Sequence, residues 1–332
     1  MSHTLIVRLP NWLGDTVMAV PALRALRSGL PDARLALAGP WVSLLAGQGL
    51  GDVLVVYPRS WSGRIRQADA LRALRAQTVI LLPNSLEAAA AARYWGARRR
   101  VGFARGGRRW LLTDAVALPE PRRHQVDEYL ALVEHLGVAR LAVEPRLDRP
   151  EADAAERVTL RELLREVGVP LASAHTRLIG IHLGAAFGPS KLWPVSHIAD
   201  LCRLVARDGG VPLLLGTADD AELAEAVGQR APALSLVGRD RPELLAALLS
   251  ELSVLVCGDT GVGHLAAALG TPVVTLFGPT DWRLTAPRGR VEVMQHPTPC
   301  APCFHRACPI DHPCMRGIAA DAVWAGVLRL TA

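Results

Sequence analysis

A carboxylate near the start of the chain is well placed for chemistry. Asp15 lies in "VRLPNWLGDTVMAVPALRALR" (residues 7–27), between a short apolar run that ends at Pro10 and an amphipathic helical pattern. By local rules alone this carboxylate caps the following helix, whose positive end favours a negative charge. In sheets covered by helices, however, ligands bind beyond the carboxyl ends of the strands, so the position is also one where a site is expected. The local pattern leaves open whether Asp15 does more than cap its helix.

A glycine-rich segment later in the chain has the features of a phosphate site. In "LVCGDTGVGHLAAALGTPVVTLFGPT" (255–280) a strand pattern ends before Asp259, and a small-residue helix begins with Gly261 and Gly263. Such residues let backbone N–H groups and the positive helix end approach a phosphate closely. The alternative is structural: Asp259 or Thr260 caps the helix and the glycines permit close packing. The spacing is not G-x-G-x-x-G, which argues against a dehydrogenase.

Two more segments place polar residues after strand patterns. In "IGIHLGAAFGPSKLWPVSHIADL" (179–201) Lys191 follows a flexible loop, where its ammonium suits a phosphate. Its alternative role is an exposed lysine before a Pro-started helix. In "LLLGTADDAELAE" (213–225) Asp219 and Asp220 are placed to cap the next helix or to accept hydrogen bonds from ribose hydroxyls, and we expect one of them to be the cap. Together these segments predict a nucleotide-diphosphate site.

The elements that must position these residues alternate between strand and helix. The expected strands cover 4–8, 34–38, 52–56, 78–82, 178–182, 211–215, a short stretch near 234, 253–257 and 272–277. The expected helices cover 16–28, 41–48, 64–75, 85–95, 124–136, 152–166, 195–208, 218–229, 241–250, 261–269 and 319–330. This alternation predicts an α/β protein with two doubly wound, Rossmann-like domains that face a cleft.

We expect the domain break at "VGVPLASAHT" (167–176), where Gly, Pro and Ser interrupt both periodicities. The predicted domains are 1–168 and 177–316, and the helix in 317–332 is expected to pack back on the first domain. A chain of 332 residues is long enough for two such cores.

The composition indicates a cytoplasmic protein. Half of the residues are apolar, but charged residues interrupt each apolar run before the roughly 20 residues that a membrane-spanning helix needs. The start, "MSHTLIVRLP", lacks the features of a secretory signal. In the cytoplasm cysteines are normally reduced.

The formal net charge of +6 is concentrated in one region. The arginines there are Arg93, Arg98, Arg99, Arg100, Arg105, Arg108, Arg109, Arg122 and Arg123. One interpretation is a solvated surface, and the other is a site for phosphates or carboxylates, which suit the planar guanidinium group. Nucleic acid is disfavoured because few aromatic residues are interleaved for base stacking.

A cysteine-rich segment, "PCAPCFHRACPIDHPCM" (299–315), contains Cys300, Cys303, Cys308 and Cys314 in the spacing C-x2-C-x4-C-x5-C. This density is compatible with zinc or an iron–sulfur cluster, but we favour a reduced structural loop or an incidental disulfide.

Four segments together resemble one family. "NWLGDTVMAVPALRALR", "HLGAAFGPSKLWP", "GDTGVGHLAAALGTPVVTLFGPT" and the cysteine-rich segment are similar to the ADP-heptose:lipopolysaccharide heptosyltransferases of glycosyltransferase family 9, closest to the heptosyltransferase II branch. The likeness covers nearly the whole chain in the right order. It implies the GT-B fold and inverting transfer of heptose from ADP-heptose to the lipopolysaccharide inner core, without a metal or other cofactor. The chain accordingly has no D-x-D triplet.

The resemblance also assigns roles to residues. It implies that Asp15 is the general base of an acceptor-binding first domain, and that Lys191 neutralises the diphosphate in a nucleotide-sugar-binding second domain. For the donor it implies Asp220 at the ribose, and Asp259, Thr260, Gly261, Gly263 and His264 near the heptose and pyrophosphate. For the acceptor we expect contacts from Asn11, Trp12, Gly14, Arg122 and His124, although "RRHQVDEYLALVEHLG" (122–137) is also compatible with a plain exposed helix.

Two further expectations follow from the resemblance. The acceptor, lipid A bearing Kdo or a first heptose, is anionic, so basic residues would draw the enzyme to the inner membrane leaflet as a peripheral protein. One branch of the family has threonines in the loop before the phosphate lysine, whereas Ala185, Ala186 and Phe187 stand here. Backbone N–H groups would then replace hydroxyl contacts. The alternatives are a related transferase with another nucleotide sugar, a non-catalytic nucleotide-sugar binder and a metal-dependent redox protein.

Overall fold

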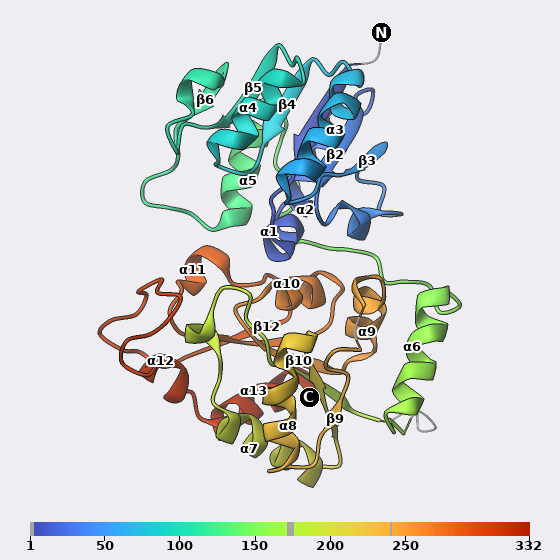
Figure 1. Cartoon of the computed structure of the whole chain (residues 1–332), viewed down its shortest axis with the longest axis vertical. Coiled ribbons are helices and arrows are strands. Elements are labelled where there is room, and N and C mark those ends of the chain that lie inside the picture. Colours follow the sequence, from blue (N-terminus) through green and yellow to red (C-terminus); the bar gives the residue numbers. More distant parts are fainter. Residues whose placement is uncertain (1–2, 171–175, 240) are drawn as a thin grey trace. The chain divides into compact units, whose positions relative to one another are not determined.

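Two α/β units make up the chain (Figure 1). The computed structural model describes residues 3–170, 176–239 and 241–332. Each unit contains a parallel six-stranded sheet covered by helices, which confirms the α/β, doubly wound prediction. The units span Met1–Pro145 and Arg146–Ala332.

The first sheet has the strand order β3-β2-β1-β4-β5-β6. Its strands are β1 (Thr4–Arg8), β2 (Arg34–Gly39), β3 (Val53–Val56), β4 (Thr78–Leu81), β5 (Arg99–Phe103) and β6 (Asp114–Val116). This is the Rossmann order, in which the chain reverses direction across the sheet between β1 and β4. Ligands bind at such a switch point, and the segment with Asp15 follows β1 directly.

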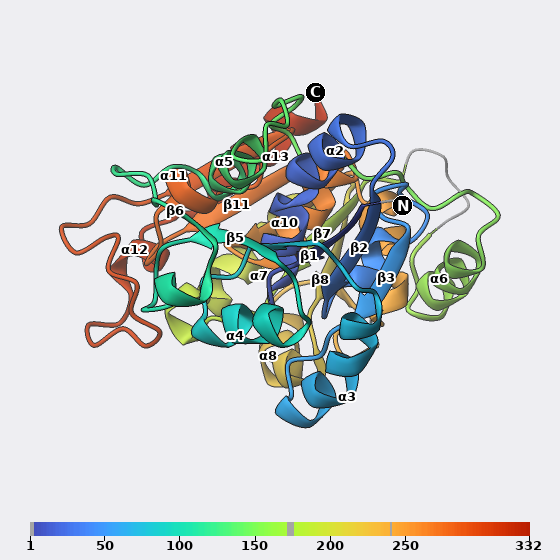
Figure 2. The ribbon, with the colours of Figure 1, turned by 90° about the horizontal axis from the view of Figure 1, so that it is seen from above.

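Helices cover both faces of the first sheet (Figure 2). They are α1 (Leu13–Met18), α2 (Val20–Gly29), α3 (Trp61–Ala73), α4 (Leu86–Tyr94) and α5 (Gln125–Glu134), with short 3-10 turns η1 (Val42–Leu45) and η2 (Arg109–Leu111). The face under α3 and α4 buries Leu71, Ala88 and Ala92 against strand residues such as Val79. Helices α2 and α5 pack against each other on the other face.

The second sheet repeats the same order as β12-β11-β10-β7-β8-β9. Its strands are β7 (Leu178–His182), β8 (Val211–Leu215), β9 (Leu234–Ser235), β10 (Val254–Gly258), β11 (Val273–Phe277) and β12 (Val291–Gln295). Its switch point lies between β7 and β10, which pair directly. The predicted Lys191 and Asp259 follow these two strands.

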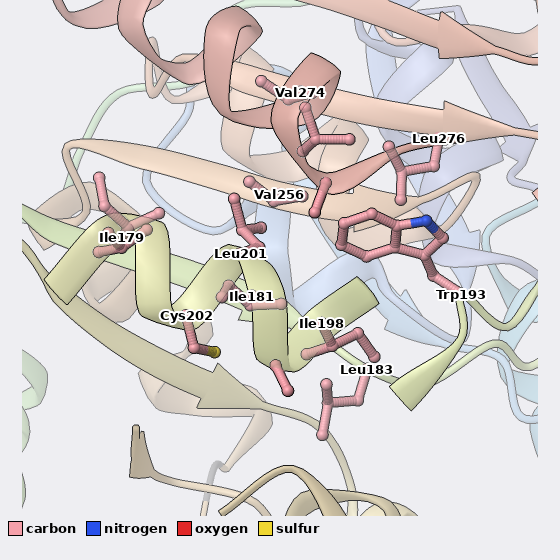
Figure 3. Close-up of a cluster of buried hydrophobic side chains, with 14 of the residues drawn as sticks. Ile179, Ile181, Leu183, Trp193, Ile198, Leu201, Cys202, Val256, Val274 and Leu276 are labelled. Carbon is pink, nitrogen blue, oxygen red and sulfur yellow. The ribbon is translucent and has the colours of Figure 1, made fainter. Parts of the chain in front are cut away.

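Helices and short 3-10 turns surround the second sheet. Its helices are α6 (Ala155–Glu166), α7 (Val195–Arg207), α8 (Ala221–Gly228), α9 (Leu245–Glu251), α10 (Gly261–Ala268), α11 (Trp282–Thr285), α12 (Pro313–Arg316) and α13 (Ala320–Thr331), with η3 (Pro189–Lys191), η4 (Ala218–Asp220) and η5 (Pro242–Leu244). In its core Ile198 of α7 lies with Val256 and Leu276 of the sheet and with Trp193 (Figure 3). The Trp193 indole also donates to the Ile318 carbonyl oxygen (2.9 Å).

Contacts place the boundary between the units earlier than the sequence break at 167–176. The backbone N–H of Leu147 donates to Ala268 O (2.8 Å), and Arg149 Nε donates to Leu269 O (2.7 Å). Helix α6 packs against α9. The residues after Pro145 therefore belong to the second unit, and residues 171–175 of the expected break lie outside the described residues.

The last helix corrects one expectation. Helix α13 packs against α7 and strands β10, β11 and β12, and it buries Val323 and Val327 in the second core. It is thus part of the second unit, whereas we had expected it to pack back on the first domain. Helices α7 and α13 together cover one face of the second sheet, and the apolar side of α13 faces the core.

Some elements differ from the sequence predictions. The helix expected at 16–28 is two helices that meet at Ala19, and Pro21 lies in the first turn of the second, where no N–H partner is needed. The helix expected at 41–48 is only the 3-10 turn η1. Strands β5, β6 and β12 were not predicted. Within the described residues, no helix is both long and apolar enough to span a bilayer.

Candidate functional site

Lys191 and Asp259 meet at the switch point of the second sheet. Lys191 Nζ donates to Asp259 Oδ2 (2.5 Å) and to the Asp259 carbonyl oxygen (3.1 Å). Their side chains are 8% and 11% exposed, so this is a nearly buried ion pair. The Thr280 hydroxyl donates to the same Asp259 oxygen (2.8 Å). The structure therefore joins two of the predicted residues and adds Thr280, which the sequence analysis quoted only as the end of a motif.

One oxygen of the Asp259 carboxylate, Oδ2, is held by Lys191 and Thr280. Thr260 is the N-cap residue, and its side chain makes no capping hydrogen bond. The N-terminal N–H groups of α10 are therefore not covered by that side chain, as an anion site requires. Gly263 is needed for packing, since a Cβ there would lie 2.7 Å from Cys257 Sγ. His264 is buried in the first turn of the helix.

Asp220 serves as a cap. The backbone N–H of Thr217 donates to Asp220 Oδ2 (2.9 Å), and the pair forms a capping box at the start of η4. The carboxylate also lies against two glycines, because a Cβ on Gly184 or Gly216 would approach Asp220 Oδ2 to 2.5 or 2.7 Å. The sequence pattern is compatible with both capping and ribose binding by this residue. The structure shows the cap and places the carboxylate beside the strand ends of β7 and β8.

His182 is a residue that the sequence analysis quoted without assigning a role. It ends β7, in register with Cys257 of β10 and Leu215 of β8. Its Nδ1 is buried and has no hydrogen-bond partner in the described part of the chain. Burial lowers the pKa of His182, while the negative charge of Asp220 raises it, and burial is the larger effect. A neutral His182 imidazole and Lys191 therefore line the same small cavity at the switch point.

The loop that carries Lys191 is held by the cysteine-rich segment, more than 100 residues later. Arg306 Nε donates to the Phe187 carbonyl oxygen (2.9 Å), and the Ser190 hydroxyl donates to His305 O (2.6 Å). The Phe187 ring lies under both cations, with Lys191 Nζ 4.6 Å and Arg306 Cζ 5.7 Å from its centroid. The Phe187 ring thus supports the Lys191 ammonium.

These contacts predict a positioning role for Arg306. We expect Arg306→Ala to raise the KM for the nucleotide-sugar donor about three- to tenfold, the value of one or two hydrogen bonds, while kcat changes less. Steady-state kinetics with varied donor would measure this split. Arg316→Ala is the matched control, because it removes an exposed arginine that directly follows the segment and pairs with Asp311. A donor KM that is equally unchanged in both variants would contradict the role of Arg306.

The four cysteines of this segment are free thiols. In the part of the chain that the structure describes, no three His, Cys, Asp or Glu side chains are grouped to hold a metal ion. Cys314 is buried under the loop after β11, because a Cβ on Gly278 would lie 2.9 Å from its sulfur. Burial raises the pKa of the Cys314 thiol. Cys300, Cys303 and Cys308 lie farther out, and the segment acts here as a support for the two loops of the site.

In the first unit, Asp15 lies in the first turn of α1. The N-cap of this helix is Trp12, whose side chain makes no capping hydrogen bond, so Asp15 is not the N-cap residue. Tyr129 of α5 is close to it: burial raises the Tyr129 pKa well above the usual value, and the charges of Asp15 and Glu128 raise it further. Helices α1 and α5 pack against each other, which brings the charge of Asp15 within electrostatic range of the buried Tyr129 phenol. Gly14 is buried beneath the same turn.

The segment before Asp15 is fixed from three sides. The Asn11 carbonyl oxygen accepts hydrogen bonds from Trp41 Nε1 (3.2 Å) and from Arg59 Nε (3.0 Å), and Arg8 Nη2 donates to the Asn11 side chain (2.6 Å). The Arg59 guanidinium stacks 4.4 Å from the Trp12 ring centroid. Burial lowers the pKa of Arg8 to about 10, which leaves it charged at neutral pH. Of the predicted acceptor residues here, Trp12 is the exposed one, at 46%.

Arg122 and His124 have structural partners. Arg122 Nε and Nη2 donate to the two carboxylate oxygens of Glu128 (2.6 and 2.9 Å), whose side chain is completely buried. His124 is the N-cap of α5, and its Nδ1 accepts a hydrogen bond from the Val126 N–H (3.3 Å). The structure thus gives each residue a local role, next to the acceptor contacts that we expected.

The Arg122–Glu128 pair yields a stability prediction. We expect Arg122→Ala to lower the free energy of unfolding by about 2 kcal/mol, because a buried carboxylate loses its bidentate partner. Urea denaturation would measure it. The double variant Arg122→Ala/Glu128→Gln should recover part of the loss. Unchanged stability together with a higher acceptor KM would instead favour direct acceptor binding by Arg122.

Comparisons with known proteins agree on one family. A model described as glycosyltransferase family 9 (heptosyltransferase) matches residues 64–313. The lipopolysaccharide heptosyltransferase 2 of Salmonella typhimurium is 29% identical over 297 residues, which cover 85% of each chain. The corresponding enzyme of Escherichia coli is 28% identical with the same coverage.

Solved structures show the same fold over the whole chain. The E. coli ADP-heptose lipopolysaccharide heptosyltransferase II superimposes with a TM-score of 0.78 at 25% identity, covering 100% of this chain and 98% of that one. An E. coli heptosyltransferase solved with ADP gives a TM-score of 0.74 at 18% identity, covering 98% and 99%, which shows a common fold. The two Rossmann-type units are those of the GT-B fold, and the chain belongs to glycosyltransferase family 9, the heptosyltransferases.

Proposed function

We propose that the protein transfers heptose from ADP-heptose to the inner core of lipopolysaccharide, with inversion at the anomeric carbon. The observation that carries this proposal is the Lys191–Asp259 pair beside the glycine-rich start of α10, at the switch point of the second sheet. It supports a site for a nucleotide diphosphate in a chain whose relatives are named lipopolysaccharide heptosyltransferase 2. A metal is not needed for this arrangement, since lysine and the helix end supply positive charge.

The second unit would bind the donor. Lys191 has three N–H donors and gives two to Asp259, which leaves one for a diphosphate oxygen. In our proposal Thr260, Gly261 and Gly263 bring the backbone N–H groups of α10 to the pyrophosphate. His264 and Asp259 contact the heptose side of the donor.

Asp220 is assigned to the ribose in the same proposal. Its Oδ2 accepts hydrogen bonds from Thr217 within the capping box, and a carboxylate has about four acceptor positions on its two oxygens. Capping and ribose binding are therefore compatible. The absence of a Cβ at Gly184 and Gly216 lets this carboxylate lie close against both backbone segments.

The first unit would supply the base. In the proposed step Asp15 takes the proton of the acceptor hydroxyl, whose oxygen attacks the anomeric carbon of heptose as its bond to the diphosphate oxygen breaks. ADP leaves with its new negative charge next to Lys191. Asp15 and Lys191 belong to different units, so the step requires the bound acceptor and donor to meet. Trp12, Asn11 and Gly14 would line the acceptor side of Asp15.

A transfer assay tests the function directly. The purified protein is incubated with ADP-heptose and a lipopolysaccharide acceptor whose inner core lacks its second heptose. Mass spectrometry then detects the change in the glycolipid, and a separate assay measures the ADP that is released. We expect the addition of one heptose and an equal amount of ADP. Transfer from a UDP-sugar in place of ADP-heptose would contradict the donor assignment. Binding of ADP-heptose without any transfer would instead support a non-catalytic binder.

The location of the acceptor extends the proposal. Lipid A is anchored in a bilayer, so we propose that the enzyme works in the cytoplasm at the inner leaflet of the inner membrane. The net charge of +6 supports this location, because anionic lipid attracts basic surfaces.

A further inference from the structure

The outer surfaces of α3 and α4 expose large apolar side chains. Trp61 and Ile65 of α3 are 68% and 67% exposed, and Leu86 and Tyr94 of α4 are both 49% exposed. Trp61 and Ile65 are four residues apart and so lie on the same side of their helix. The two helices lie next to each other on one face of the first sheet (Figures 1 and 2). We call this surface, from Trp61 to Arg72 of α3 and from Leu86 to Arg93 and Tyr94 of α4, the α3–α4 face.

Side-chain contacts make the α3–α4 face a single surface. Arg64 Nη1 forms an ion pair with Glu87 Oε2 (2.9 Å), which joins the first turns of the helices. At the other end the Tyr94 hydroxyl donates to Asp69 Oδ1 (2.7 Å), and Arg72 Cζ lies 5.3 Å from the Tyr94 ring centroid. The exposed apolar groups therefore belong to a surface with fixed geometry.

The charge of this region is strongly positive. Residues 59–110 include twelve arginines and only two acids, Asp69 and Glu87. Both acids are already engaged, Glu87 with Arg64 and Asp69 with the Tyr94 hydroxyl. The exposed arginines on or beside the face are Arg66, Arg72, Arg75, Arg93 and Arg98. Exposed aromatic and aliphatic groups thus stand among cations that few carboxylates balance.

This combination fits the surface of an anionic bilayer. Trp and Tyr favour the headgroup level of a membrane, where one end of the side chain is apolar and the other is wet. Arginine binds phosphate through its planar fork, and its aliphatic stem can lie along apolar surface. A face with exposed Trp and Ile among arginines therefore matches headgroups and upper acyl chains together.

We propose that the α3–α4 face docks the protein on bilayers of anionic phospholipid. The inference rests on the proposed function, because the lipid-anchored acceptor lies in such a bilayer. Trp61 and Ile65 enter the interface, and Arg66, Arg72 and Arg93 bind the phosphates of the headgroups. None of these five residues belongs to the proposed donor or base machinery, so docking and chemistry can be separated by mutation.

Vesicle sedimentation tests the docking surface without any acceptor. The full-length protein is mixed with vesicles of phosphatidylglycerol and phosphatidylcholine, or of phosphatidylcholine alone, at several salt concentrations. We expect binding only to the anionic vesicles and a loss of binding as salt rises. Trp61→Ser/Ile65→Ser should weaken binding about tenfold, and Arg66→Glu/Arg72→Glu about a hundredfold. Val158→Ser and Arg165→Glu on α6, both exposed, are the matched apolar and charge controls and should bind like the wild type.

Transfer to a detergent-solubilised acceptor separates this inference from the proposed function. The variants of the α3–α4 face should keep wild-type kcat with that acceptor and lose turnover only when the acceptor is embedded in vesicles. Equal vesicle binding by the wild type and both double variants, or equal binding to neutral and anionic vesicles, would overturn the docking surface. Absence of transfer by the wild type in detergent would overturn the function, while sedimentation would still decide the surface.

Discussion

Replacing Asp15 by Asn is expected to lower kcat by roughly 10²- to 10⁴-fold, the contribution of a general base. The amide keeps the size of the side chain in the first turn of α1 but cannot take the acceptor proton. The affinity for ADP should stay within about twofold of the wild type, because the donor is proposed to bind the other unit. Transfer kinetics and calorimetry with ADP give the two values.

The matched control for this variant is Asp32→Asn. Asp32 is an exposed carboxylate in the turn between α2 and β2 of the same unit, so its loss should leave kcat unchanged. Unfolding midpoints of both variants show whether the fold is intact. Turnover of Asp15→Asn close to that of Asp32→Asn would refute the assignment of Asp15 as the base. The role of Asp15 would then be to interact with the positive end of helix α1.

Replacing Lys191 by Met is expected to weaken ADP binding roughly ten- to hundredfold, the value of a charged hydrogen bond to phosphate. We expect kcat to fall a further roughly 10²- to 10³-fold, because the leaving ADP loses a positioned cation. The single variant also leaves the Asp259 carboxylate nearly buried, with the Thr280 hydroxyl as its remaining side-chain donor among the described residues. Breaking a buried pair in this way costs about 3–5 kcal/mol of stability.

A second pair of variants separates the structural role of Lys191 from its phosphate role. Asp259→Asn keeps the cation and should keep ADP binding, because the ammonium then has a weaker internal competitor. Lys191→Met/Asp259→Asn removes both charges and should regain most of the lost stability while ADP binding stays weak. Calorimetry with ADP and thermal unfolding without ligand distinguish these effects. Normal ADP affinity in the double variant would show that Lys191 serves only to neutralise Asp259.

The arginine-rich region illustrates how a charge pattern can conceal structure. Its composition indicates a solvated surface or an anion site, and no strand is predicted there. In the structure Arg99 and Arg100 begin β5, and Arg99 pairs with Asp114 (2.8 Å) of β6. Arg108 is completely buried, with Nε donating to Phe103 O (3.1 Å) and Nη2 to Asn84 Oδ1 (3.0 Å). Long arginine side chains can satisfy backbone carbonyls far along the chain, and local periodicity does not reveal this.

The sequence by itself determined the parts of this protein that depend on short spacings. Alternating strand and helix patterns predicted the two doubly wound sheets, because periods of 2 and 3.6 residues are local properties. Strand ends followed by Asp15, Lys191 and Asp259 predicted where a site lies, since parallel strands end at one edge of a sheet. The combination of four motifs also indicated the family that the comparisons show.

Only the tertiary structure decided how these residues are used. Lys191 and Asp259 are 68 residues apart, and Arg306 is 119 residues from Phe187, so no local pattern links them. The same holds for α13, whose apolar stripe shows that it packs somewhere but not on which sheet. For Asp15, the sequence left a choice between cap and base. The fold assigns the N-cap to Trp12 and packs α1 against α5, the helix of Tyr129, because packing brings together elements whose separation along the chain carries no information.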